Sequence, residues 1–111
     1  MPIKPSLQML LDHAQKQNDD AAKKLGQLTS FQQQAEQKLN LLLEYRHTYQ
    51  SQFQDSAKNG VSHTNWSNFN SFMNKLDTAI TEQRQNVENA SNNRKIGGTE
   101  FQVRQGKLKS Y

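Results

Sequence analysis

A chain of 111 residues has room for one domain, and with only 32% hydrophobic residues it carries too few apolar side chains for an ordinary globular core. It contains no cysteine, which excludes disulfides and zinc–thiolate sites. The formal charge of +4 comes entirely from residues 89–111, because residues 1–88 carry equal numbers of acidic and basic side chains.

Two architectures fit this composition: a disordered chain, or a helical rod whose core is a seam of about two positions in seven. Proline occurs only at Pro2 and Pro5 and a helical period persists through most of the chain, so we expect the rod. No apolar run approaches the roughly 20 residues needed to span a bilayer, and no secretory signal follows Met1. We therefore expect a soluble, cytoplasmic protein that reaches a membrane only through partners.

The first predicted helix spans about residues 5–57, with Pro5 in its first turn, where the missing N–H has no helical partner to lose. Apolar residues then recur with the three-four spacing of the a and d positions of a heptad. Small residues in this seam let helices approach closely, and Asn18, Gln32 and Arg46 interrupt it. The seam positions are Leu7, Leu11, Ala14, Asn18, Ala21, Leu25, Leu28, Gln32, Ala35, Leu39, Leu42, Arg46, Tyr49 and Phe53.

The connection between the two predicted helices covers about residues 58–63. Asn59-Gly60 tolerates the left-handed conformation that ends helices, and Ser62 and Thr64 each offer a hydroxyl to cap the next helix. So short a connection returns the chain antiparallel to the first helix.

The second predicted helix spans about residues 64–111 and repeats the heptad spacing. It weakens from Ala90, and each glycine of Gly97-Gly98 costs about 1 kcal/mol relative to alanine within a helix. Its seam positions are Trp66, Phe69, Met73, Leu76, Ile80, Gln83, Val87, Ala90, Arg94, Gly97, Phe101, Arg104, Leu108 and Tyr111. The predicted fold is therefore all-α: residues 1–111 form a single antiparallel two-helix coiled coil, a long helical hairpin.

The sequence offers no candidate catalytic, cofactor-binding or metal-binding residues. His13, His47 and His63 lie on separate segments, without the paired spacing of metal ligands. The acidic pair Asp19-Asp20 would stand on an open rod, which provides no pocket for acid–base chemistry. We therefore expect neither an enzyme nor a cofactor.

Large side chains near the turn exceed what a two-helix seam can bury, since Tyr45 and Phe72 fall beside the seam. Two stripes at helical spacing, one on each helix, face the same way and form one apolar surface. Such surfaces usually mark protein-binding sites, and aromatic residues dominate the energies of protein interfaces. The stripe residues are Leu42, Tyr45, Tyr49, Phe72, Leu76 and Ala79. A thicker core near the turn and self-association into a four-helix bundle are the alternatives.

The basic excess of residues 89–111 admits three interpretations: a solvated helix face, a surface for an acidic protein, or a surface for nucleic acid. Aromatic side chains do not alternate with these charges beyond Phe101, so we expect a solvated face and no nucleic-acid partner. A self-associating helical hairpin or a basic-tailed, nucleic-acid-binding coiled coil remains the alternative function. The charges are Arg94, Lys95, Arg104, Lys107 and Lys109.

Three local patterns lie between about Leu7 and Val87, a stretch that matches one protein family without gaps. The first is the stretch 21–26, which ends in a leucine-glycine pair, and the second runs from Gln37 through Tyr45 to Tyr49. The third comprises Gly60-Val61-Ser62, Trp66, Asn68-Phe69, Phe72, Leu76 and Ala79-Ile80. Together these patterns resemble the flagellar FliJ family of type III export proteins.

The resemblance implies a coiled coil similar to the central stalk of rotary ATP synthases, with a non-enzymatic role in flagellum assembly and motility. The implied partners are the hexameric export ATPase, the cytoplasmic domain of the large export-gate subunit, and chaperones of export substrates. These partners would hold the protein at the cytoplasmic face of the inner membrane, without direct membrane insertion. Family members usually continue for several more helical turns, so we expect this chain to lack a further C-terminal helical segment.

The resemblance also implies two binding sites. The export gate would contact the two aromatic stripes, at Leu42, Tyr45, Tyr49, Phe72, Leu76 and Ala79. The export ATPase would contact the end of the rod that holds both termini, at Leu7, Leu11, Leu25, Arg94, Lys95 and Arg104.

Overall fold

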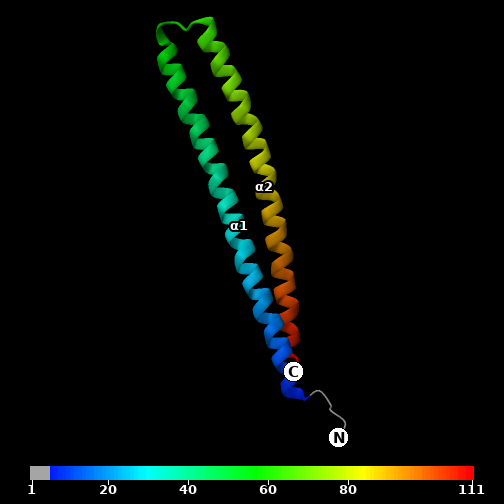
Figure 1. The fold of residues 1–111 in the computed structure, drawn as a ribbon. Coiled ribbons are helices and arrows are strands. Elements are labelled where there is room, and N and C mark those ends of the chain that lie inside the picture. The colour runs from blue at the N-terminus through cyan, green and yellow to red at the C-terminus, as the bar shows by residue number, and fades with distance from the viewer. Residues whose placement is uncertain (1–5) are drawn as a thin grey trace. The chain divides into compact units, whose positions relative to one another are not determined.

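The computed structural model describes residues 6–111, which form two long helices joined by a short connection (Figure 1). Helix α1 is Leu7–Ser56, the 3-10 turn η1 is Ala57–Asn59, and helix α2 is His63–Lys109. No strand occurs in this part of the chain, which confirms the all-α prediction. The expected place of Pro5 in a first helical turn lies outside the described residues.

Serine hydroxyls cap the beginning of both helices. The backbone N–H of Met9 donates to Ser6 Oγ at 3.0 Å, and that of Asn65 donates to Ser62 Oγ at 3.1 Å. Each bond satisfies one of the backbone donors that a helix leaves unpaired in its first turn. The cap at Ser62 was predicted from the sequence, whereas Thr64 lies inside α2.

Gly60 allows the chain to reverse. Its φ of +99° is a backbone conformation that residues with a Cβ rarely adopt, and its N–H donates to the Ala57 carbonyl at 2.9 Å. Because α2 begins at His63, the reversal is complete within a few residues and the two helices return antiparallel.

Packing between the helices divides the chain into two compact units. Unit 2 is Gln33–Glu88 and contains the turn with the adjoining parts of α1 and α2. Unit 1 combines Met1–Gln32 with Asn89–Tyr111. Within each unit, a segment of α1 lies antiparallel beside a segment of α2 (Figure 1).

Large aliphatic side chains form the core of unit 2. Met73, Leu76 and Ile80 recur at three-four spacing along α2 and are all buried. One turn further on, Gln83 is only 4% exposed, and its Nε2 donates to the Ala35 carbonyl on α1 at 2.9 Å. This hydrogen bond satisfies a polar group that would otherwise be costly to bury.

Small residues form the core of unit 1. Ala14 and Ala21 are buried on α1, and Gly97 is buried on α2. A Cβ atom built on Gly97 would lie 2.6 Å from Leu28 Cδ1, so the absence of a side chain there makes room for the leucine methyl group. Helix α2 continues through this glycine, because the packing outweighs its low helix propensity.

Candidate functional site

Six aromatic rings from both helices pack as one continuous ladder in unit 2. Three come from α1 at intervals of four residues and three from α2 at intervals of three, so each set lies along one side of its helix. Because the helices are antiparallel, the ring nearest the turn on one helix meets the ring nearest the turn on the other. This aromatic ladder consists of Tyr45, Tyr49, Phe53, Trp66, Phe69 and Phe72.

The rings of the ladder contact one another over its whole length. Phe53 and Phe69 stack with centroids 3.9 Å apart and planes 7° apart, and the Tyr49 centroid lies 4.5 Å from that of Phe72. Tyr45 ends the ladder edge-to-face against Phe72, at 6.0 Å and 84°. Aromatic pairs in such arrangements contribute about 0.5–1.5 kcal/mol beyond the burial of their area. The ladder therefore holds the exposed ring of Tyr45 in a defined orientation.

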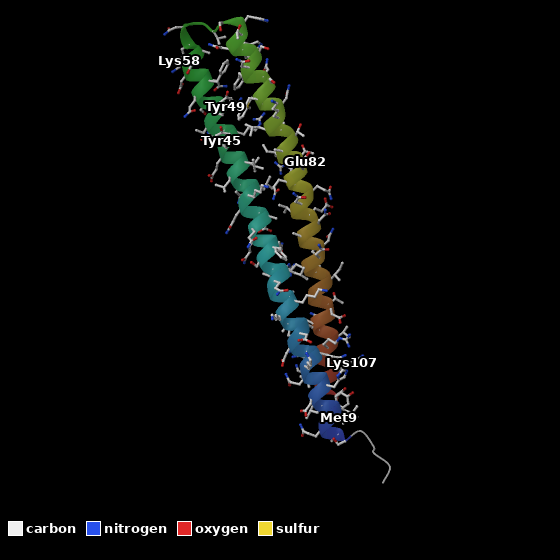
Figure 2. The ribbon with its side chains drawn as sticks, in the orientation of Figure 1. Met9, Tyr45, Tyr49, Lys58, Glu82 and Lys107 are labelled. Atoms are coloured by element: carbon white, nitrogen blue, oxygen red, sulfur yellow. The ribbon has the colours of Figure 1, made fainter. Side chains whose placement is uncertain are left out.

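Tyr45 and Phe72, the two side chains that sequence spacing placed beside the seam, meet in the structure. Tyr45 is 52% exposed, and it lies one turn before Tyr49 along α1 (Figure 2). Phe72 is half-buried beneath it. We call the six predicted stripe residues the apolar patch: Leu42, Tyr45, Tyr49, Phe72, Leu76 and Ala79.

Leu76 differs from the other members of the apolar patch. It is 7% exposed and belongs to the core between the helices, so it offers little surface to a partner. Leu41, which sequence reasoning left outside the patch, is 64% exposed. It precedes Tyr45 by four residues, a spacing that places both on one side of α1, and this spacing was the available signal. Leu41 therefore extends the exposed apolar surface.

A hollow of about 300 Å³ opens where the aromatic ladder meets the turn. Tyr49, Phe53 and Phe69 line it on the ladder side, and Gly60 and Val61 line it on the turn side. Four polar residues also line it, so the hollow is mixed in polarity: Ser56, Ser62, Asn65 and Asn68.

An ion pair joins the two helices beside the aromatic ladder. Arg46 Nε lies 2.6 Å from Asp77 Oδ1, and Arg46 Nη2 lies 3.5 Å from Asp77 Oδ2. The hydrogen bond from Arg46 lowers the pKa of the Asp77 carboxyl group, and the same bond raises the pKa of Arg46. Sequence spacing marked Arg46 as an interruption of the seam, but its charge has a partner on the other helix. Because the pair is open to solvent, it helps to define the register more than it adds stability.

The second predicted site falls in unit 1. Arg104 is half-buried and already engaged, since it donates to Glu100 Oε1 at 2.9 Å and to Gln17 Oε1 at 3.3 Å. Leu7 and Lys95 are exposed. The remaining members are half-buried: Leu11, Leu25 and Arg94. These six residues are thus divided between the helix interface and the surface.

Two kinds of site are absent from the described part of the chain. No three His, Asp or Glu side chains among residues 6–111 gather in a way that could hold a metal ion. In the same range, neither helix has a stretch long and apolar enough to cross a bilayer.

Comparison with known proteins places this arrangement in a family. The family model described as "Flagellar FliJ protein" matches residues 3–111. The flagellar FliJ protein of Salmonella typhi is 37% identical over 79 residues, which are 71% of this chain and 54% of that protein. The flagellar FliJ protein of Escherichia coli K12 is 34% identical over 82 residues, or 74% of this chain and 56% of that protein. The chain spans about half the length of these curated relatives, and it belongs to the flagellar FliJ family.

Proposed function

We propose that this chain is a non-enzymatic component of the flagellar protein export apparatus, and that the apolar patch of unit 2 binds the cytoplasmic domain of the large export-gate subunit. Membership of the flagellar FliJ family supports the export role. One observation carries the proposed gate contact. The exposed ring of Tyr45 packs against Phe72, on a side of the helix pair that is open to solvent.

The geometry of the patch suits tight binding by a few residues. Binding hot spots are enriched in aromatic side chains that are already held in their bound orientation. Contacts with Phe72 and Tyr49 restrict the ring of Tyr45, so its capture by a partner costs less rotamer entropy than capture of a free tyrosine. The neighbouring Leu41 adds exposed apolar area on the same side of α1.

The remaining partners of the proposal are the hexameric export ATPase and export chaperones. The ATPase would contact unit 1 through the predicted set Leu7, Leu11, Leu25, Arg94, Lys95 and Arg104. Residues 89–111 supply the whole basic excess of the chain, which supports attraction to an acidic surface. Such partners would bring a cytoplasmic protein to the inner face of the inner membrane.

The test of the gate contact is the double variant Tyr45→Ala/Phe72→Ala. We expect binding to the purified gate domain, measured by calorimetry, to fall by about 30-fold or more, as for the loss of interface hot spots. Swimming in soft agar should fall with it. Phe31→Ala is the matched control, because Phe31 is a similarly exposed aromatic residue of unit 1.

A loss of gate binding supports the patch only if circular dichroism shows that the double variant keeps wild-type helicity. A double variant that keeps its helices and binds the gate domain like wild type would refute the assignment. A wild-type dimer that the double variant converts to monomer would instead make the patch a self-association surface.

A further inference from the structure

Unit 1 carries a groove of about 570 Å³ between α1 and α2. Its apolar residues are Ala21, Leu28, Ile96 and Gly97, of which Ala21 and Gly97 are buried. The groove exists because alanine and glycine occupy seam positions that hold large side chains in unit 2. The Cδ1 methyl groups of Leu28 and Leu25 lie beside Gly97, at 2.6 and 3.8 Å from the place of a Cβ atom there.

The exposed apolar side chains of unit 1 continue the sides of this groove. Lys24 lines the groove. The exposed Leu10 precedes it by two heptads and the exposed Phe31 follows it by one, so all three share one heptad position. Ile96 is 67% exposed, and Val103 follows it by one heptad on α2. Single exposed apolar residues are ordinary on protein surfaces, but their alignment along one groove indicates a surface for a partner.

Both acidic side chains that line the groove have ion-pair partners, whereas some of the basic side chains around it have none. The carboxylate of Asp20 lies 3.4 Å from Lys16 Nζ, and that of Glu100 lies 2.9 Å from Arg104 Nε. Lys24 has no ion pair within residues 6–111, and neither has Lys107, which is one heptad beyond Glu100 (Figure 2). The uncompensated charge beside the groove is therefore positive, in line with the net +4 of residues 89–111.

The groove has the length of a short helix. Its lining on α1 runs from Gln17 to Leu28, and its lining on α2 runs from Asn93 to Arg104. Twelve helical residues extend for about 17 Å, which is about three turns of a helix laid alongside. Amphipathic helices dock into such grooves with apolar residues at i, i+3 or i+4, and i+7.

We propose that the groove of unit 1 binds an acidic amphipathic α-helix of a partner protein. The apolar side of that helix covers Ala21, Leu28 and Ile96, and its flanking carboxylates meet Lys24 and Lys107. The site is separate from the apolar patch of unit 2 and does not depend on the gate contact. A second copy of this chain fits less well, because the like charges of residues 89–111 would repel each other. Nucleic acid fits less well because Asp20 and Glu100 line the groove and no aromatic ring does.

The proposal can be tested with two fluorescein-labelled helical peptides of about 18 residues, or about five helical turns. Both carry leucine along one side; one carries glutamate along the flanks and the other lysine. Fluorescence anisotropy with the full 111-residue chain should show the acidic peptide binding about 10-fold or more tightly than the basic one. Raising the salt from about 50 to about 300 mM should weaken this preference, since the charges involved are exposed.

Three variants locate the binding. Ile96→Glu should weaken the acidic peptide by about 10-fold or more, because it removes apolar area and adds a repelling charge. Lys24→Glu should weaken the acidic peptide and strengthen the basic one. Lys75→Glu is the matched control, because Lys75 is an exposed lysine of unit 2 and the same charge change there should leave peptide binding unchanged.

The proposal fails if the acidic peptide does not bind at up to about 1 mM, a limit that corresponds to about −4 kcal/mol. It also fails if both peptides bind equally, or if Ile96→Glu changes peptide binding no more than Lys75→Glu does. Two further outcomes would overturn it by showing that the groove binds something else. One is a single-stranded oligonucleotide whose binding Ile96→Glu abolishes, and the other is a dimer in sedimentation velocity that the same variant dissociates.

Discussion

Unit 2 and unit 1 differ in the size of the side chains that fill the space between α1 and α2. In unit 2, aromatic rings interdigitate and Leu76 is buried between the helices. In unit 1, Ala21 and Gly97 occupy seam positions and a groove of about 570 Å³ remains beside them. One heptad spacing thus accompanies stacked rings between the helices in unit 2 and a groove between them in unit 1. The spacing determines which positions face the partner helix and not how much volume they carry.

The difference suits the two units to different kinds of recognition. Unit 2 presents a protruding ring, Tyr45, held in place by its neighbours, and a partner would need a complementary pocket for it. Unit 1 presents a concave strip with uncompensated positive charge, and a partner would need a convex, acidic surface such as a helix. Four comparisons between variants test the contrast.

Truncation of Leu76 should have the largest effect, because it creates a cavity in the best-filled part of unit 2. Leu76→Ala is expected to lower the free energy of unfolding by about 2–5 kcal/mol. Urea denaturation followed by circular dichroism measures this loss. Leu10→Ala, at an exposed leucine of unit 1, should cost less than about 1 kcal/mol. Equal losses in the two variants would show that burial does not distinguish these positions.

Enlargement of Ala21 should have the next largest effect, because the seam of unit 1 depends on small residues. Ala21→Leu is expected to destabilise by about 1–3 kcal/mol through overpacking. The neighbouring and exposed Ala22→Leu serves as the control and should be nearly neutral. If Ala21→Leu were instead stabilising, the groove would be spare volume that a larger side chain can fill from within.

The adjacent glycines of α2 should respond differently to alanine. A Cβ at Gly98 meets no atom within 4 Å, so Gly98→Ala should stabilise the helix by up to about 1 kcal/mol. At Gly97 the new methyl group must displace Leu28 Cδ1, so Gly97→Ala should gain less or nothing. Thermal unfolding of both variants provides the comparison. Equal stabilisation would mean that Leu28 changes rotamer at little cost, and that the stability of unit 1 does not depend on close approach of the helices at Gly97.

The ion pair of unit 2 should have the smallest effect, visible only in acid. Arg46 lowers the folded-state pKa of Asp77 below its ordinary value of about 3.9, so the pair stabilises the fold above that value. This contribution disappears as the pH falls through the folded-state pKa. The drop in melting temperature from about pH 7 to about pH 2 should therefore be smaller in Asp77→Asn than in wild type.

Glu44→Gln is the control for this pH dependence, because no ion pair to Glu44 occurs in the described part of the chain. Its pH profile should match that of wild type. An Asp77→Asn profile that also matches wild type would show that the pair with Arg46 does not contribute.

Much of the fold and part of the candidate site could be predicted from spacing along the chain. The alternation of apolar residues indicated two helices, and Ser62 was correctly predicted to cap the second one. The stripes at helical spacing placed Tyr45 and Phe72 on the same side, and the structure brings their rings together. These predictions succeed because they depend on the helical period and on local hydrogen bonds, which neighbouring residues determine.

Other features could not be predicted from spacing. Leu76 belonged equally to the seam and to the apolar patch, and only packing against α1 shows that it is buried. Spacing alone marks Arg46 as an interruption of the seam, and only the structure shows that Asp77, far along the chain, is its partner. The groove of unit 1 requires Ala21 and Gly97, from opposite ends of the chain, to lie next to each other.

The sequence by itself determined the two helices, their turn at Gly60 and the side of each helix that carries the aromatic stripes, because periodicity and capping are local properties. The tertiary structure decided which stripe residues remain exposed, which charges are compensated and where a hollow opens. Those outcomes depend on the register of one helix against the other and on the volumes that meet across the seam. Neither quantity can be read from one helix alone.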